Sequence, residues 1–151
     1  MKLPAGATGF GPLEQASHYD ARSFLKACHD AARRTGGKVT ATHQAGVTPN
    51  FHTVVITCGH EHVAVLRHAL LPLIALAQAP ADAVPLAPAF IDHTHLAHIL
   101  SQTTGCQVLS TTDLHQPIAS ADLSELTPAE HTQIRYWKPT TVGELLFNYW
   151  D

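Results

Sequence analysis

Residues 38–58, KVTATHQAGVTPNFHTVVITC, carry the clearest strand pattern of the chain. Its first part, Lys38 to Ala45, alternates apolar and polar side chains, and its last part, Phe51 to Cys58, is rich in β-branched residues. The intervening GVTPN has the composition of a turn. Two strand-like segments joined by a short turn predict an antiparallel hairpin, and therefore a mainly antiparallel sheet.

Helices are predicted on both sides of this hairpin. Residues 18–35 follow a capping Ser17, place apolar residues on one face and end at two glycines. Residues 61–78 are apolar almost all round after His68, which predicts a buried helix with a defect at Pro72. The two helices are expected to cover the sheet, which makes the predicted fold class α+β.

Shorter elements are expected further along the chain. Asp92 is predicted to cap a helix that runs to about Thr104 and is closed by Gly105. Short strands are predicted on either side of this helix, at residues 90–91 and 106–110.

The last segment, TPAEHTQIRYWKPTTVGELLFNYWD at residues 127–151, predicts two helices. Each starts with a T-x-x-E capping box, at Thr127 and Thr141, and Pro139 separates them. The second helix has a wide apolar face. We therefore expect a C-terminal helix-turn-helix that packs on the core and exposes Glu144, Asn148 and Asp151.

This ending resembles the C-terminus of a group of small uncharacterised bacterial proteins. The likeness is carried by RYWKPTTVGELLFNYWD with TPAE before it, and extends more weakly to HALLPLIALA and AFIDHTHLA. The group has no known activity. The resemblance therefore implies a single domain with an integral tail, and no function.

Length and composition indicate one globular domain over residues 1–151. The chain is 45% hydrophobic and 14% charged, and its Gly-, Ala- and Pro-rich residues 1–15 predict a loosely ordered lead-in. A net charge of −3 gives no footprint for nucleic acid or an acidic membrane. The sequence also predicts no signal peptide and no membrane span. Three distant cysteines without a C-x-x-C pair predict reduced thiols and a cytoplasmic protein.

Two histidine clusters offer candidate metal ligands in a chain with twelve histidines. Cys58, His60 and His62 occupy alternate positions, so a continuing strand would point a thiolate and two imidazoles the same way, as zinc requires. Gly59 favours the alternative, a strand-to-helix elbow at which these side chains diverge.

The second cluster lies at the start of the predicted helix from Asp92. His95 and His98 share one face of that helix, and Asp92 is placed to cap it or to orient His95. A four-ligand zinc site requires the two clusters to meet. The histidines elsewhere in the chain favour the other interpretation, in which histidine is an ordinary polar residue; they include His18, His29, His43, His52, His115 and His131.

The motifs leave two main classes of function. The chain has no G-x-S-x-G, Walker, G-x-G-x-x-G or H-E-x-x-H motif. This favours a non-catalytic protein-binding domain, such as an adaptor, an inhibitor or an immunity-type factor, without a cofactor. The alternative is a zinc-dependent enzyme built on the clusters, or a cysteine-dependent one with Cys58 as nucleophile. A third hypothesis is pH sensing by the imidazoles.

Overall fold

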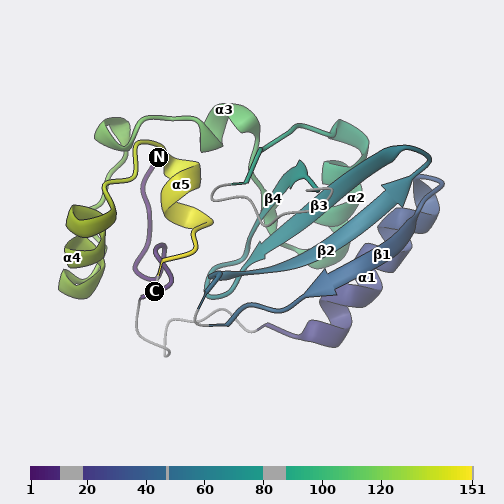
Figure 1. Ribbon diagram of the computed structural model, residues 1–151, viewed down its shortest axis with the longest axis horizontal. Coiled ribbons are helices and arrows are strands. Elements are labelled where there is room, and N and C mark those ends of the chain that lie inside the picture. The colour runs from purple at the N-terminus through teal and green to yellow at the C-terminus, as the bar shows by residue number, and fades with distance from the viewer. Residues whose placement is uncertain (11–18, 47, 80–87, 151) are drawn as a thin grey trace.

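The computed structural model describes residues 1–10, 19–46, 48–79 and 88–150, which include a five-stranded sheet with helices around it (Figure 1). The strands follow chain order across the sheet, and among them the β4–β5 pair is parallel while the others are antiparallel. The α+β class with a mainly antiparallel sheet is therefore confirmed. The strands are β1 (Lys38–His43), β2 (Phe51–Cys58), β3 (Glu61–His68), β4 (Leu73–Gln78) and β5 (Gln107–Val108).

Two helices, α1 (Ala21–Arg34) and α2 (Thr94–Thr104), cover one face of the sheet. The capping side chain of α1 is Asp20, whose carboxylate accepts from the amides of Arg22 and Ser23; the predicted cap Ser17 lies outside the described residues. The core on this face is one apolar cluster, which includes Phe24, Cys28, Val54, Ile56, Val65, Ile74, Leu76 and Leu100.

The predicted helix over residues 61–78 is wrong. This segment forms β3 and β4, the central strands of the sheet, with a turn at residues 69–72 that contains Pro72. Most of its side chains are buried on both faces of the sheet. A continuous apolar run fits a strand covered on both sides as well as it fits a buried helix, and periodicity alone does not separate the two.

The cap of α2 differs by one residue from the prediction. Nδ1 of His93 accepts from the amide of Leu96 at 3.1 Å, so His93 is the capping residue. The Asp92 carboxylate instead accepts from the amide and hydroxyl of Thr111, at 2.9 and 2.6 Å. Thr111 starts α3 (Thr111–Leu114), and the first amides of a helix need such outside acceptors. The predicted end at Gly105, with φ 71°, is confirmed.

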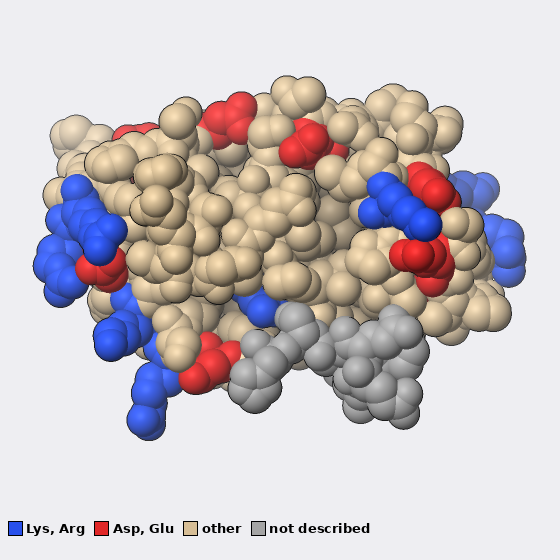
Figure 2. Space-filling model, turned by 180° about the vertical axis from the view of Figure 1, so that it is seen from behind, with Lys and Arg blue, Asp and Glu red and all other residues tan. Residues whose placement is uncertain are grey.

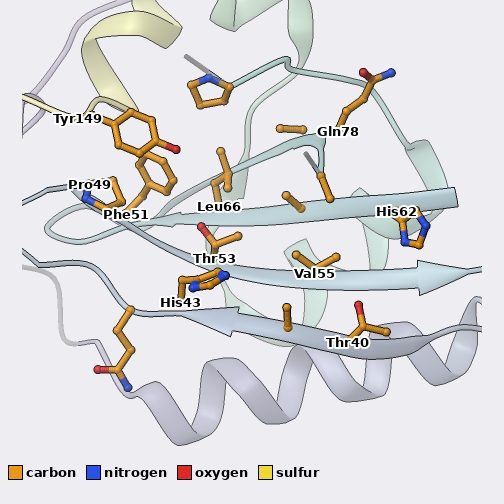
Figure 3. Close-up of a pocket in the computed structure, with 16 residues that line it drawn as sticks. Thr40, His43, Pro49, Phe51, Thr53, Val55, His62, Leu66, Gln78 and Tyr149 are labelled. Atoms are coloured by element: carbon orange, nitrogen blue, oxygen red, sulfur yellow. The ribbon is translucent and has the colours of Figure 1, made fainter. Parts of the chain in front are cut away.

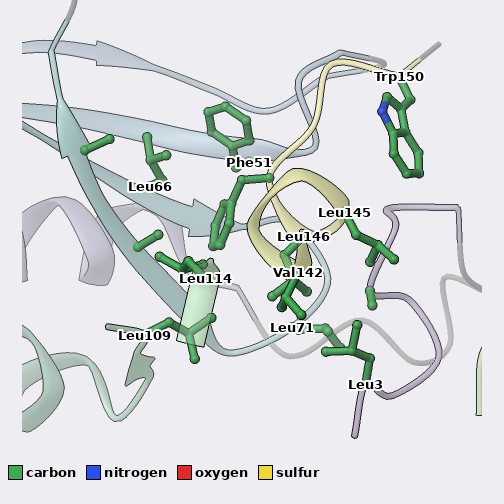
Figure 4. Packing of buried hydrophobic residues seen from close by; sticks show 14 of the residues in the cluster. Leu3, Phe51, Leu66, Leu71, Leu109, Leu114, Val142, Leu145, Leu146 and Trp150 are labelled. Atoms are coloured by element: carbon green, nitrogen blue, oxygen red, sulfur yellow. The ribbon is translucent and has the colours of Figure 1, made fainter. Parts of the chain in front are cut away.

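The other face of the sheet carries the C-terminal segment and the first residues of the chain (Figure 4). Leu3 is 1% exposed and Thr8 is fully buried, so the predicted loose lead-in is wrong for residues 1–10; residues 11–15 lie outside the described residues. The cluster on this face includes Leu3, Phe51, Leu66, Leu71, Leu114, Val142, Leu145, Leu146, Phe147 and Trp150.

Both predicted capping threonines start helices: Thr127 caps α4 (Pro128–Trp137) and Thr141 caps α5 (Val142–Leu146). The reciprocal capping box forms at α4 only, because the Glu144 carboxylate at α5 accepts from Thr140 instead of Thr141. A 3-10 helix, η2 (Ile118–Ser120), precedes them. The five-residue α5 is buried in the core, whereas Glu130 is the buried residue of α4. The helix-turn-helix layer is therefore not confirmed in the predicted form. Tyr136 and Trp137 are 75% and 37% exposed at the end of α4.

Asn148 was predicted to be exposed, and this is wrong, because it is 4% exposed and pairs with Asn50. The Asn148 amide donates to Oδ1 of Asn50 at 2.8 Å, and Nδ2 of Asn50 donates to the carbonyl of Leu146 at 2.9 Å. Nδ2 of Asn148 also donates to the Thr8 carbonyl at 3.0 Å. These bonds hold the tail on the sheet and place the next residue, Tyr149, beside the site described below. The predicted exposure of Asp151 lies outside the described residues.

A candidate binding trough on the sheet

A row of small side chains crosses the sheet on the face that carries the C-terminal segment. Its members are direct cross-strand partners: Ala41 lies opposite Val55, Val55 opposite Ala64, and Ala64 opposite Ala77. They line a cavity of about 690 Å³ (Figure 3). Since neighbouring strands lie about 4.8 Å apart, a row across four strands is roughly 14 Å long. The row is the floor of a trough that runs across the strands.

Larger side chains form the two walls of this trough. On one side the next row is His43, Thr53 and Leu66, and beyond it Tyr149 packs edge-on against Phe51 with ring centroids 5.4 Å apart. The walls on the other side include Thr40 and His62. In β2 and β3 this arrangement follows from strand alternation, because residues two apart on a strand share one face of the sheet. In β1 the register shifts between Val39 and Ala41, and the adjacent residues Thr40 and Ala41 both line the trough.

The polar groups of the trough are hydroxyls, side-chain amides and imidazoles. Oγ1 of Thr57 lies 2.9 Å from Oγ1 of Thr40 and 2.9 Å from Nδ1 of His62, so three side chains share a hydrogen-bonded chain on this face. The Tyr149 hydroxyl and the His43 ring have no hydrogen-bond partner among the described residues. Burial raises the pKa of Tyr149. No Asp, Glu, Lys or Arg is among the described lining residues. The trough therefore suits an apolar group that is contacted by hydroxyls, side-chain amides and imidazoles.

The first candidate metal cluster lies at a hairpin turn instead of an elbow into a helix. Gly59 and His60 form the two-residue turn between β2 and β3, with Gly59 at φ 61°, a conformation that glycine adopts without strain. His60 is exposed at this turn. His62 is hydrogen-bonded to Thr57, while the Cys58 thiol donates to the carbonyl of Thr35 at 3.4 Å. The three predicted ligands thus have separate surroundings.

The second cluster lies on the other face of the sheet. His95 and His98 are both exposed on α2, which covers the face opposite the trough. Within the described part of the chain, no three His, Cys, Asp or Glu side chains are grouped so that they could hold a metal ion. The structure therefore does not bring Cys58, His60, His62, His95 and His98 together as a ligand set.

Cys58 lacks the support that a nucleophile needs. Its thiol donates to the carbonyl of Thr35, the C-cap of α1, and has no hydrogen bond to a histidine among the described residues. A strand follows Cys58, so the helix N-terminus that the cysteine hypothesis requires is not there. The other two thiols are buried, and desolvation raises the pKa of Cys28 to about 12.

Sequence reasoning missed every residue of the trough floor. Assigning residues 61–78 to a helix hid the row, because Ala64 and Ala77 become neighbours of Val55 and Ala41 when the segment forms two strands. A usable signal was present. If residues 61–78 are written as two strands in hairpin register after FHTVVITC, Ala64 and Ala77 lie level with Val55 in one row across the sheet.

Comparisons with known proteins gave no match: no family model, no curated protein and no solved structure is similar to this chain. The likeness of the tail to a group of small bacterial proteins therefore stays a prediction. No helix of the described residues is long and apolar enough to cross a membrane.

Proposed function

We propose that this protein is a non-catalytic, cytoplasmic protein-binding domain that holds an apolar segment of a partner protein in the trough. The observation that carries the proposal is the row of small side chains between taller walls, which leaves about 690 Å³ beside a strand edge. Binding cavities for small groups are commonly about 300–1,000 Å³ and mostly apolar, with a few convergent polar groups. A trough of roughly 14 Å accommodates one or two large apolar side chains.

The chemistry around the trough supports binding over catalysis. His62 is hydrogen-bonded to Thr57, but no carboxylate of the described residues orients its ring, so a nucleophile–base–acid set is not assembled. Cys28, Cys58 and Cys106 are free thiols, which favours a reducing compartment such as the cytoplasm.

Filling the trough should abolish partner binding. Ala41→Trp places an indole on the floor of the trough, whereas Thr42→Trp adds the same ring to an exposed position that points to the other face of β1. The ligands are dodecapeptides selected on the wild-type protein from a random displayed library. We expect them to bind Ala41→Trp at least about tenfold more weakly than wild type, a loss of about 1.4 kcal/mol of binding free energy. Thr42→Trp should bind them within about twofold of wild type.

Fluorescence anisotropy of the enriched peptides measures both variants, and the thermal unfolding midpoint of each checks that it is folded. Two results count against the proposal: peptides that bind Ala41→Trp as well as wild type, and a selection in which no sequence is enriched.

A further inference from the structure

The outer edge of β1 has no strand paired with it among the described residues, although the trough opens there. β1 is one end of the sheet order and is six residues long, whereas β5 at the other end has two residues. Lys38, Thr40, Thr42 and His43 are exposed. The register of β1 shifts between Val39 and Ala41, and on either side of this irregularity the free edge presents backbone donors and acceptors to which an extended chain can pair.

The floor of the trough begins at this edge with an alanine, Ala41. Ala41 leaves the space above β1 open, so a side chain from a strand added outside β1 can reach over it towards Val55 and Ala64. Side chains of an added strand alternate between the two faces, so every second one points to the trough face. Strand addition therefore supplies both main-chain pairing and a side chain for the trough.

The first residue of β1 lies at a positively charged end of the molecule. Arg33 and Arg34 share the carboxylate of Asp30, at 2.7 and 3.1 Å, and Lys38 has no ion pair among the described residues. Lys38 pairs with Thr57, whose hydroxyl is on the trough face. Figure 2 shows Lys and Arg side chains gathered at the end of the molecule that carries α1. A strand antiparallel to β1 has its carboxyl end there, which makes an acidic end complementary.

We propose that the partner contributes an extended segment that pairs antiparallel with the outer edge of β1, inserts a large apolar side chain over Ala41 and ends on a carboxylate beside Lys38. This inference rests on the proposed function and adds the conformation and chemistry of the bound segment.

The test uses the peptide fluorescein-TVTWTVTD, which alternates as a strand and ends on aspartate. We expect it to bind the wild-type protein in an anisotropy titration, and replacement of its tryptophan by alanine to weaken binding at least about tenfold. Methylating alternate backbone amides produces two isomers. One should lose at least about tenfold in affinity, because its amides face β1, and the other should stay within about twofold, because only alternate amides of a strand point to one neighbour.

Charge exchange tests the orientation. Lys38→Glu should lower the affinity for the peptide that ends on aspartate about threefold. It should raise the affinity for a version that ends on lysine by a similar factor, because one exposed ion pair contributes about this much. Lys26→Glu, the same change at an exposed position on α1, should leave both affinities within about 1.5-fold.

The failures of the two proposals are distinguishable. If neither methylated isomer loses affinity, or if the parent peptide does not bind, strand addition is wrong, while the library selection still decides the function of the trough. If Ala41→Trp binds the parent peptide normally and the methylation pattern holds, β1 binds strands but the trough is not the site.

Discussion

Replacing Glu130 by alanine should lower the free energy of unfolding by about 3–5 kcal/mol. Glu130 is fully buried. Its Oε1 accepts from the amides of Gly6 and Thr8 and from the Thr8 hydroxyl, at 3.0, 3.1 and 2.8 Å, and its Oε2 accepts from the amide of Thr127 at 3.0 Å. Alanine leaves these donors without an acceptor in the interior, and each unsatisfied buried donor costs about 1–3 kcal/mol.

Urea denaturation followed by tryptophan fluorescence measures this effect, and two variants calibrate it. Glu130→Gln keeps one oxygen acceptor but turns its NH₂ towards a donor, so we expect an intermediate loss of about 1.5–3 kcal/mol. Glu144→Gln is the control, because Glu144 makes its bonds to Thr140 in an exposed setting; its loss should stay below about 1 kcal/mol. A Glu130→Ala protein as stable as the control would show that the N-terminal residues do not depend on this carboxylate.

Acid should destabilise the protein between pH 6.5 and pH 4 through one buried imidazole. His68 is fully buried. Its Nδ1 accepts from the amides of Leu70 and Leu71, both at 3.1 Å, so the proton is on Nε2, which donates to the Ala7 carbonyl at 2.8 Å. Burial lowers the pKa of His68 to about 4, and the nearby Arg67 and His52 also lower it, while the Ala7 carbonyl and Glu130 raise it.

The direction of the effect follows from these two pKa values. Between pH 6.5 and 4 the unfolded chain binds a proton at His68 that the folded chain does not, so the stability is present above pH 6.5 and is lost as the pH falls to about 4. The loss from this residue is about 3 kcal/mol. His52, whose pKa burial also lowers, adds a loss of the same sign. Hydrogen bonds lower the pKa values of three carboxylates below 3.8, so their protonation reduces the stability only at more acid pH. These are Asp20, Asp92 and Asp122.

Urea denaturation of wild type and His68→Gln at several pH values between 4 and 7.5 isolates this contribution. The variant should be less stable at pH 7.5, and its deficit should shrink by about 3 kcal/mol at pH 4, because glutamine does not titrate. His95→Gln, at an exposed position on α2, should follow wild type at every pH. A deficit that is the same at pH 4 and pH 7.5 would mean that His68 does not limit acid stability.

The elements with strong local signals were predictable from the sequence. The hairpin of β1 and β2, the end of α2 at Gly105 and the threonine caps of α4 and α5 all form where local pattern places them. The 61–78 segment was not predictable in this way. Its apolar run fits a buried helix as well as it fits buried strands. It forms strands because β2 and β4 pair with β3 on either side.

The polar contacts that hold the tail were beyond sequence reasoning for a different reason. Glu130 binds Thr8, and Asn148 binds Asn50 and Thr8, across most of the chain. Glu130 was recognisable as part of a capping box, in which its Oε2 accepts from the amide of Thr127. The partners of its Oε1, Gly6 and Thr8, are not specified by any local pattern. The trough follows the same rule, because its floor takes one residue from each of four strands.

Alanine methyl NMR shows whether the row from Ala41 to Ala77 binds the partner segment. With ¹³C-labelled alanine methyls and an unlabelled peptide enriched in the library selection, we predict intermolecular NOEs to Ala41 and Ala64 in the trough. Ala27 and Ala31, on the buried side of α1 at the opposite face of the sheet, should give none. NOEs that avoid Ala41 and Ala64 and instead connect the peptide to the exposed rings of Tyr136 and Trp137 would contradict the account.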